Sequence, residues 1–304
     1  MINSPGPVVP NFIIIGAPKS GTTSLFYYLK QHPDIYLPNR KELHYFTYDL
    51  LRENANGPGD RHIITTLCTT RGEYESYYRG VSGQRMIGEV SPSYLYYSSV
   101  SERILSELGK IKIIAILRNP VEKAYSQYMH LVRDNLETLT FYNALMKEEE
   151  RRALGWSDIW RYAESSLYMD RLETYKKVFG PDNVKILFFD DLISDPDNLM
   201  RDIFIYLCVN ADIRCDTSKT YNRSGKPRFR LIADFFAKPN IIKDIAKRIL
   251  PDRIRIPLRI ALHSLNTGRK DPMDERSKKY LLKYFQKDIE SLEGMIARKL
   301  HWLE

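Results

Sequence analysis

The sequence has little of what marks a secreted, metal-binding or membrane-spanning protein. It contains three cysteines in 304 residues, Cys68, Cys208 and Cys215, and this odd number without metal-ligand spacing argues against a disulfide framework or a cysteine-bound metal. The first residues, MINSPGPVVPNF, include no basic segment before an apolar stretch, and no apolar run is long enough to cross a bilayer. These absences predict a cytoplasmic protein with no membrane span.

Acidic residues are the less numerous charged class. Asp and Glu number 38 against 46 Lys and Arg, an excess of eight positive charges that suits anionic ligands. Apart from this charge the chain has no nucleic-acid-binding motif, so nucleic acid is not an expected partner. With 43% hydrophobic residues, the chain is expected to form one domain over residues 1–304, with a binding core at about 11–230 and a basic helical region at 231–304.

The most informative stretch is Asn11–Leu25, NFIIIGAPKSGTTSL. Phe12–Ile15 is an apolar, β-branched run, as expected of a parallel strand buried on both faces. Gly16 and Gly21 then bracket a turn whose backbone N–H groups can face one anion, and a helix opens directly after it. The stretch predicts a phosphate-binding loop formed by Lys19, Ser20, Gly21, Thr22, Thr23 and Ser24.

This loop differs from that of the nucleotide triphosphatases, G-x-x-x-x-G-K-[ST], which places its Lys after the second Gly and a hydroxyl on Mg²⁺. Here Thr22 occupies the Lys position and the lysine is Lys19. The strand at Ile111–Leu117 ends in Arg118 instead of a metal-binding Asp. We therefore expect a phosphate site without a metal, and keep a P-loop kinase or nucleotide hydrolase as the alternative.

A second strand-to-helix crossing carries another anion site. The strand at Ile111–Leu117 is followed by Arg118, then by Asn119 and Pro120, which are an N-cap residue and a first-turn proline. Ser126 lies in the helix that begins there, where it can share an anion with Arg118, and His130 lies on the same helical face as Ser126. Two such crossings suggest a nucleotide with two separated phosphates.

These residues resemble those of the sulfotransferases that use 3′-phosphoadenosine 5′-phosphosulfate (PAPS). In that family a P-K-x-G-T-T-x-L turn binds the 5′-phosphosulfate, which Pro18–Leu25 matches, and an R-N-P-x-x-R/K-A-x-S helix binds the 3′-phosphate, which Arg118–Ser126 matches. The resemblance implies PAPS as co-substrate, 3′-phosphoadenosine 5′-phosphate (PAP) as product, and no metal.

Further motifs follow in the family's order. Lys41–Phe46 (KELHYF) resembles the K-E-x-H-F-F segment of heparan-sulfate-type members, and Glu89–Tyr94 resembles their E-K-S-x-x-Y segment with Val in place of Lys. Gln127–His130 is similar to the Y-x-H of the N-sulfotransferase branch, and Phe188–Leu192 to the family's E-D-L strand end. The resemblance implies that Glu89 orients the acceptor or a catalytic lysine.

The chemistry assigns a role to each candidate catalytic residue. Lys19 is placed to neutralise charge on the leaving phosphate. The resemblance implies Glu42 as the base, and burial in a cleft would raise its pKa toward working pH. His44 lies two residues on, on the same side of an extended segment, and His130 is the third candidate.

The resemblance also implies a third wall of the donor site. The loop Tyr221–Arg228 corresponds to the family's lid, with Lys226 and Arg228 as its basic groups, and Tyr168 matches a tyrosine near the adenine pocket. The segment Lys238–Lys270 holds nine Lys or Arg against two Asp, which favours docking of an anionic acceptor or an acidic carrier protein. The alternative for this segment is a helix whose charged face is exposed to solvent and serves only solubility.

The periodicity predicts a P-loop-like α/β domain, with a central, mostly parallel sheet flanked by helices on both faces. An irregular insertion is expected at 50–80, a break in the pattern at 229–270, and one long amphipathic helix at 273–303. Strands are expected at 11–16, 85–90, 111–117 and 184–188, and helices at 22–31, 98–108, 120–133, 139–155, 165–179 and 196–207.

The acceptor remains open at this point. A hydroxyl or amine on a small molecule, on a carbohydrate or on an acyl carrier protein all suit the motifs, as does sulfation of a natural product. A non-catalytic module for anionic ligands leaves the ordered motifs unexplained. The sequence does not specify the oligomeric state.

Overall fold

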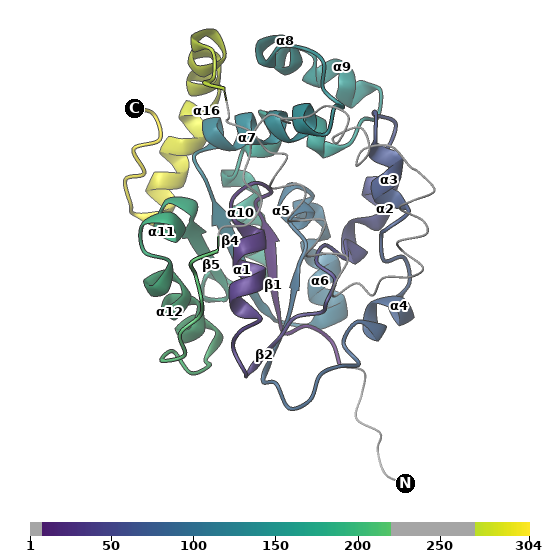
Figure 1. The fold of residues 1–304 in the computed structure, drawn as a ribbon, viewed down its shortest axis with the longest axis vertical. Helices are drawn as coiled ribbons and strands as arrows, with labels where there is room; N and C mark the ends of the chain where they lie inside the picture. The colour runs from purple at the N-terminus through teal and green to yellow at the C-terminus, as the bar shows by residue number, and fades with distance from the viewer. Residues whose placement is uncertain (1–7, 220–270) are drawn as a thin grey trace.

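The computed structural model describes residues 8–219 and 271–304, and they form a layered α/β structure around one parallel sheet (Figure 1). Within these residues the sheet has five strands in the order β2-β3-β1-β4-β5, and every neighbouring pair is parallel. The strands are β1 (Phe12–Gly16), β2 (Ile35–Tyr36), β3 (Met86–Val90), β4 (Lys112–Leu117) and β5 (Val184–Phe188). The predicted fold class is confirmed.

The central strands are apolar throughout because helices cover the sheet on both faces. Along β1, Ile13 and Ile15 belong to one hydrophobic core, while Phe12 and Ile14 belong to the core on the opposite face. This alternation follows from the two-residue repeat of a strand. A parallel sheet buried on both faces therefore produces the continuous apolar runs of the sequence.

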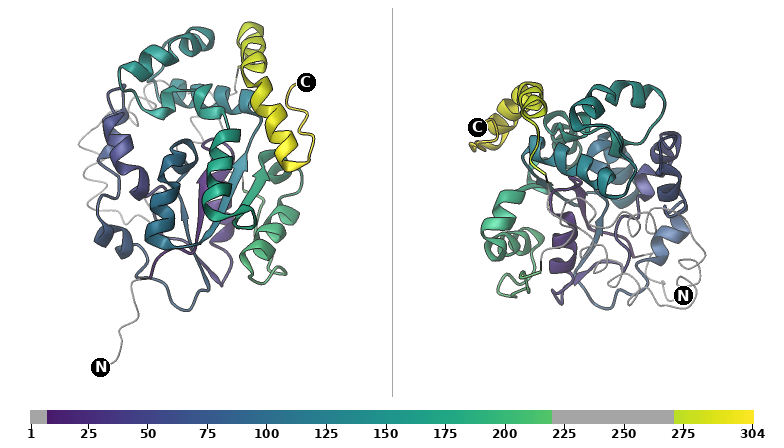
Figure 2. Two further views of the ribbon diagram at one scale, coloured as in Figure 1. Left: turned by 180° about the vertical axis from the view of Figure 1, so that it is seen from behind. Right: turned by 45° about the horizontal axis from the view of Figure 1, so that its top comes forward.

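Each face has its own set of helices. Helices α1 (Thr22–Leu29), α11 (Phe189–Ser194) and α12 (Pro196–Leu207) contribute to the core that contains Phe12. The opposite face is covered by α5 (Ser93–Tyr96), α6 (Ser101–Leu108) and α10 (Met169–Phe179), which lie in front of the sheet when it is seen from behind (Figure 2).

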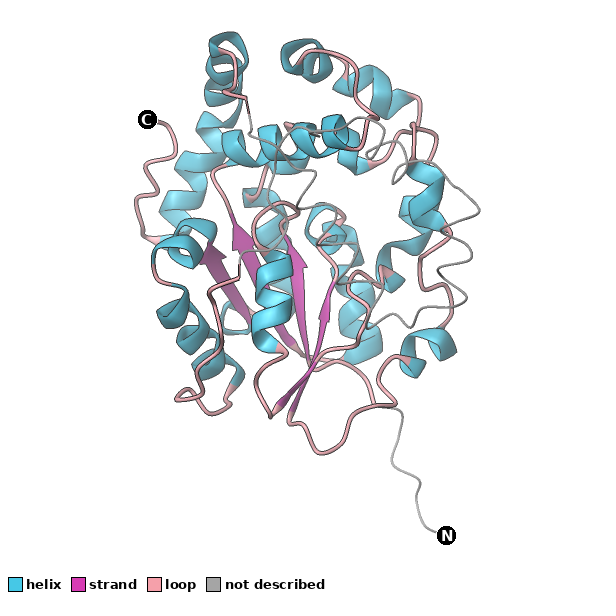
Figure 3. Cartoon of the chain, viewed as in Figure 1, coloured by secondary structure: helices cyan, strands magenta, loops and turns pink. Residues whose placement is uncertain are grey.

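A further layer lies beyond the carboxyl ends of the strands. The strand arrowheads point toward α7 (Pro120–Arg133), which begins where predicted: the Asn119 side chain accepts from the Val121 N–H at 3.0 Å, and Pro120 is the first helical residue (Figure 3). Helix α16 (Glu275–Ile296) packs against α7, α8 (Phe141–Met146) and α10.

Several predicted elements differ from the structure. The expected irregular insertion at 50–80 contains the short helices α2 (Tyr48–Glu53), α3 (Asp60–Ile64) and α4 (Arg71–Ser76). The expected helix 139–155 is split into α8 and α9 (Glu148–Ala153), and Glu148, the first residue of α9, accepts from the N–H groups of Ala163 and Glu164. The expected helix 165–179 begins at Met169.

The long helix near the end of the sequence is shorter than predicted. Helix α16 ends at Ile296, where Ala297 takes a left-handed conformation with φ of 52°, and residues 297–303 form a tail along the molecule. Asp288 of α16 caps α10 by accepting from the N–H groups of Tyr168 and Met169 at 3.0 Å. This cap explains why α10 begins at Met169. The segment 229–270 lies outside the described residues.

Candidate active site

A cleft of about 940 Å³ opens at the carboxyl ends of β1, β3 and β4. Open parallel sheets bind ligands at the carboxyl ends of their strands. The binding site lies at the topological switch point, where successive strands start to be added on the other side of the first strand. Many of the predicted site residues line this one cleft, although they come from distant parts of the sequence. They are Lys19, Gly21, Thr22, Thr23, Ser24, Glu42, His44, Arg118, Ser126 and His130.

The loop after β1 has the backbone of an anion-binding turn. Lys19 and Gly21 both take left-handed conformations, with φ of 64° and 93°. A Cβ atom at Gly21 would lie 2.6 Å from Leu192 Cδ2, so both the backbone and the packing require glycine there. Helix α1 begins after Gly21 with no side-chain cap, and its first residues, Thr22, Thr23 and Ser24, line the cleft.

The Lys19 ammonium is the central cation of the cleft. Burial and the positive charges of the nearby Arg133 and Arg118 lower its pKa to about 7. The negative charges of Asp134 and Glu42 oppose this effect but do not cancel it. In the free protein Lys19 therefore titrates near neutral pH. A bound phosphate or sulfate would favour the charged ammonium.

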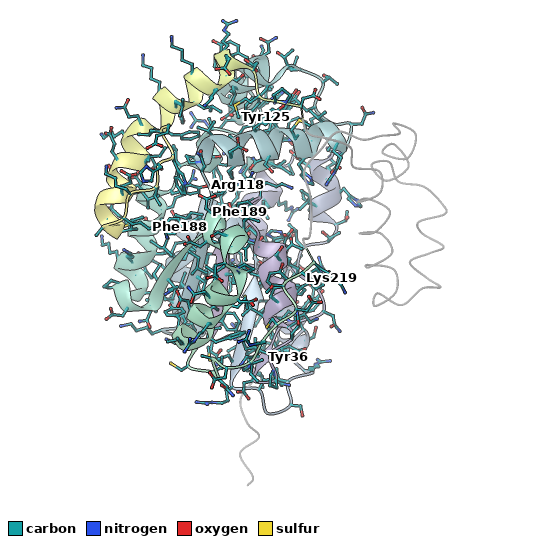
Figure 4. The ribbon with its side chains drawn as sticks, turned by 60° about the vertical axis from the view of Figure 1, so that its left-hand side comes forward. Tyr36, Arg118, Tyr125, Phe188, Phe189 and Lys219 are labelled. Atoms are coloured by element: carbon teal, nitrogen blue, oxygen red, sulfur yellow. The ribbon has the colours of Figure 1, made fainter. Side chains whose placement is uncertain are left out.

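Arg118 joins the two predicted phosphate sites. Its guanidinium donates to the Lys19 carbonyl at 3.3 Å and lies over the Phe189 ring at 4.7 Å from the ring centre. Figure 4 shows Arg118 and Phe189 side by side at this end of the sheet. The hydroxyl of the buried Tyr168 donates to the Arg118 carbonyl at 2.8 Å. Arg118 is therefore fixed through its side chain and its backbone.

The segment holding Glu42 and His44 is anchored at the end of β3. The Glu42 N–H donates to the Val90 carbonyl at 2.9 Å, and the His44 N–H donates to the Ser91 hydroxyl at 3.2 Å. Both Glu42 and His44 take left-handed conformations, with φ of 65° and 55°. Such strain in residues other than glycine is concentrated at functional sites. His44 Nε2 lies 3.9 Å from Glu42 Oε2.

Glu42 does not have the raised pKa that we expected. Burial alone would raise its pKa, but Lys41, which forms an ion pair with Glu42, and His44 outweigh burial and lower it to about 2. The prediction overlooked this competition between desolvation and a neighbouring cation. At neutral pH Glu42 is ionised and able to accept a proton.

The two histidines are neutral at pH 7. Burial lowers the pKa of His44 to about 4 against the opposing effect of Glu42, and its Nδ1 lies 2.7 Å from the Ser93 hydroxyl. Burial, Lys19 and Arg133 lower the pKa of His130 well below its usual value. Because Arg133 can only donate to His130 Nδ1, at 2.6 Å, the neutral His130 carries its proton on Nε2.

Glu89 lies in the core beneath the cleft. It is fully buried and accepts from the hydroxyls of Tyr74, Ser91 and Tyr94 at 2.6, 2.6 and 2.5 Å. Ser91 in turn accepts from the His44 N–H. Through Ser91, Glu89 therefore supports the backbone of the Glu42–His44 segment.

Two other predicted residues that the structure describes, Ser20 and Tyr168, are not part of the cleft lining. Ser20 and Tyr168 are buried beneath it, with their hydroxyls near each other. Lys226 and Arg228 lie outside the described residues, together with the rest of the expected lid and the segment Lys238–Lys270.

The structure adds residues that the sequence pattern did not single out. Arg133 and Asp134 line the cleft one turn beyond His130, and Arg133 donates to the Asp134 carboxylate at 2.8 Å. Their spacing of three and four residues from His130 was the available signal. Lys41 and Phe189 complete the surroundings of Glu42 and Arg118. Within residues 8–219 and 271–304, no three His, Cys, Asp or Glu side chains are grouped as a metal site.

Taken together, the sheet order, the glycine-bounded loop after β1 and the arginine at the end of β4 define a nucleotide-phosphate-binding α/β protein of the P-loop type. Residues 10–212 match the model of the sulfotransferase family. The chain belongs to this family.

Individual relatives agree with this assignment. A sulfotransferase structure from Alicyclobacillus acidocaldarius is 33% identical, superposes with a TM-score of 0.78, and is matched over 98% of this chain and 100% of that one. The membrane-associated sulfotransferase kil1 of Dictyostelium discoideum is 28% identical over 97% of this chain and 66% of its own length. Mouse heparan sulfate glucosamine 3-O-sulfotransferase 3B1 is 26% identical over 79% of this chain and 60% of its own length.

The chain thus spans about two thirds or less of the length of these two curated relatives. No helix among the described residues is both long enough and apolar enough to cross a membrane.

Proposed function

We propose that this protein is an enzyme that transfers the sulfuryl group of PAPS to a hydroxyl or amine acceptor. One observation carries the proposal: Lys19 and Arg118, from the ends of two different strands, are linked by a hydrogen bond in the cleft that also contains Glu42 and His44. A cation for each phosphate group and a proton acceptor opposite them are what sulfuryl transfer requires. The family assignment supports the same activity.

The groups proposed to bind PAPS match its two phosphate-bearing ends. The uncapped N-terminus of α1 and the Lys19 ammonium suit the 5′-phosphosulfate, because N–H groups and the helix dipole favour an anion. Arg118 and the buried Ser126 of α7 suit the 3′-phosphate. The hydrogen bond from Arg118 to the Lys19 carbonyl supports this assignment, because it holds the two proposed phosphate-binding groups close together.

The reaction is an in-line displacement at sulfur. The acceptor hydroxyl gives its proton to the base, its oxygen forms a bond to sulfur, and the bond from sulfur to the bridging oxygen of PAPS breaks. The electron pair of that bond goes to the phosphate of PAP, where Lys19 offsets the developing charge. Positioning and charge stabilisation account for catalysis, without a covalent enzyme intermediate.

Glu42 is the proposed base. It is ionised at neutral pH, whereas His130 presents a proton on Nε2 and so acts as a hydrogen-bond donor to the transferring group. The ion pair with Lys41 keeps the pKa of Glu42 low in the free protein. An acceptor that separates Lys41 from Glu42 would raise the pKa of Glu42 and make it a stronger base.

Calorimetry with PAP and with ATP, each with and without a chelator of divalent cations, tests the proposal. We expect PAP to bind without metal and more tightly than ATP, because Arg118 and Ser126 face a 3′-phosphate that ATP lacks. Arg118→Ala is expected to weaken PAP binding by about tenfold or more, the effect of removing a charged hydrogen bond. Arg152→Ala, at an exposed site on α9, is the matched control. Equal or metal-dependent binding of ATP would indicate a kinase or nucleotide hydrolase instead.

A further inference from the structure

We propose that Arg133 is a further catalytic residue, whose guanidinium binds the transferring sulfuryl group of PAPS beside Lys19. This inference rests on the proposed function. The motifs that resemble the family do not include Arg133, because the motif on α7 ends at His130. Three features carry the inference: the place of Arg133 in the cleft, the hydrogen bonds that hold its side chain, and the charges around it.

Arg133 lies on the face of α7 that borders the cleft. Ser126, His130 and Arg133 are spaced by four and then three residues, which places them on one face of the helix, and all three line the cleft. Arg133 is two helical turns, or about 10 Å, beyond Ser126. Because Ser126 is a proposed ligand of the 3′-phosphate, Arg133 is placed to bind a different group of the nucleotide.

The end of α7 that carries Arg133 adjoins both Lys19 and Glu42. Burial lowers the pKa of Lys19 most, and among the neighbouring charges that of Arg133 has the largest effect. The pKa of His130, one turn before Arg133, is lowered by burial, Lys19 and Arg133, and is also affected by Glu42. In the proposed reaction Lys19 faces the leaving oxygen and Glu42 the acceptor, so the sulfur lies between them. Arg133 is therefore the arginine at the reacting group.

Two of the three guanidinium nitrogens hold the Arg133 side chain in place. Nε donates to Asp134 at 2.8 Å, and Nη2 donates to Nδ1 of His130 at 2.6 Å. Among the described residues, the third nitrogen, Nη1, has no hydrogen-bond partner. Because the side chain is only 12% exposed, the guanidinium is largely shielded from water. The remaining N–H donors of this fixed cation suit an anion that enters the cleft.

The carboxylates near Lys19 already have other cationic partners. Asp134 accepts from Arg133, and Glu42 forms an ion pair with Lys41. The positive charges of Lys19 and Arg133 therefore disfavour each other in the free protein, as the lowered pKa of Lys19 shows. An anion bound between these two cations would remove that penalty. The sulfuryl group of PAPS brings such a negative charge, and PAP has no sulfuryl group.

Comparing PAPS with PAP isolates the contribution of the sulfuryl group, because the two nucleotides differ by that group alone. Calorimetry without an acceptor measures both affinities at pH 6, where Lys19, with a pKa of about 7, is mostly protonated. We expect Arg133→Met to weaken PAPS binding by about tenfold or more, the effect of losing a charged hydrogen bond, and to leave PAP affinity within about twofold. Arg118→Ala should instead weaken both nucleotides by a similar factor.

Two further variants separate a direct contact from structural support. In Arg133→Gln the amide can still donate to Nδ1 of His130 but carries no charge, so we expect the same loss of PAPS affinity as in Arg133→Met. Arg152→Met, at an exposed site on α9, is the matched control and should change neither affinity. Unchanged PAP binding also shows that each variant is folded.

The outcomes distinguish this inference from the proposed function. A loss of PAP affinity as large as the loss of PAPS affinity, or no loss of PAPS affinity, in Arg133→Met would overturn the inference. Full PAPS affinity in Arg133→Gln would also overturn it, because Arg133 would then act only through His130. In each case PAP binding by the wild type leaves the proposed function standing, whereas a wild type that binds no PAP would overturn the proposed function itself.

Discussion

Burial, together with two nearby guanidinium groups, brings the pKa of the Lys19 ammonium near neutral pH. Burial and the charges of Arg133 and Arg118 lower its pKa to about 7, so raising the pH through 7 removes the proton from the free protein. A donor nucleotide brings negative charge to the same place and favours the protonated form. Binding of the nucleotide and protonation of Lys19 are thus linked.

This linkage predicts proton uptake on binding. At pH 8 we expect PAP to bind with net uptake of protons, and its affinity to fall as the pH rises from 6 to 9, because more of the free Lys19 must be reprotonated. Calorimetry in buffers of different ionisation enthalpy measures this uptake. Lys19→Arg, which stays charged, should lose the uptake while keeping much of the affinity. Identical proton uptake by wild type and Lys19→Arg would refute the linkage.

Glu42 gives a second prediction at the residue scale. Glu42→Gln should lower the turnover rate by about 10²–10⁴, the usual range for loss of a general base, with PAP affinity nearly unchanged. In the free protein the pKa of Glu42 is about 2, so Glu42 should give no acidic fall in kcat/KM between pH 5 and 9. Single-turnover assays with labelled donor measure this effect, with Glu102→Gln on α6 as the control. Ordinary turnover by Glu42→Gln would make His44 the leading base.

The sequence allowed prediction of the two cations, Lys19 and Arg118, that line the cleft, but not of their electrostatic environment. Arg118 directly follows an apolar strand and Lys19 lies in the glycine-bounded turn after another, so the local pattern was sufficient to place both near the strand ends. The sign of the pKa shift of Glu42 depends on whether Lys41 or burial dominates, and that requires coordinates. The tautomer of His130 likewise depends on the rotamer of Arg133.

The elements with strong local signals were predicted well. Helices α7 and α12 begin and end where the caps and prolines place them, and the four longer strands agree to within one residue. Strand β2 has two residues, too few for a periodic pattern. Helix α3 was missed because its position depends on Asp60, which accepts from the Ser157 and Trp160 side chains at 2.7 and 3.1 Å, about a hundred residues further on.

The 297–303 tail forms hydrogen bonds with the elements that surround Arg118. Arg298 donates to both carboxylate oxygens of Asp191 in α11, at 2.7 and 2.8 Å. The buried Trp302 donates through Nε1 to Asp190 and accepts, through its carbonyl, from the cap residue Asn119. Because α11 also carries Phe189, which lies over Arg118, the tail positions the predicted 3′-phosphate site.

Removing one tail contact should therefore weaken donor binding. We expect Arg298→Ala to lower PAP affinity several-fold with little change in unfolding temperature, since an ion pair as exposed as Arg298–Asp191 contributes only about 0–1 kcal/mol. Calorimetry and thermal unfolding measure the two effects. Lys299→Ala is the control, because the Lys299 side chain is 80% exposed. Equal PAP affinity in the two variants would show that the tail does not position the site.

At the scale of the whole molecule, α16 joins the core. It packs on α7 and α10, and Asp288 caps α10. We therefore expect one unfolding transition, with tryptophan fluorescence and circular dichroism coinciding in urea. PAP at a hundred times its Kd should add about 2.7 kcal/mol to the free energy of unfolding, with AMP as the control ligand. Two separate transitions would show that α16 is an independent unit.

The buried Asp60 carboxylate limits which segments of this protein can be replaced during evolution. It accepts from the N–H of Gly57 at 2.8 Å and from the N–H and hydroxyl of Ser157 at 2.9 and 2.7 Å, so it links two segments that line the cleft, 51–64 and 157–159. Neither segment belongs to the sheet. Transplanting one segment alone from a relative would leave the buried Asp60 carboxylate or its partners without a hydrogen bond, so an exchange that keeps the fold has to replace both segments together.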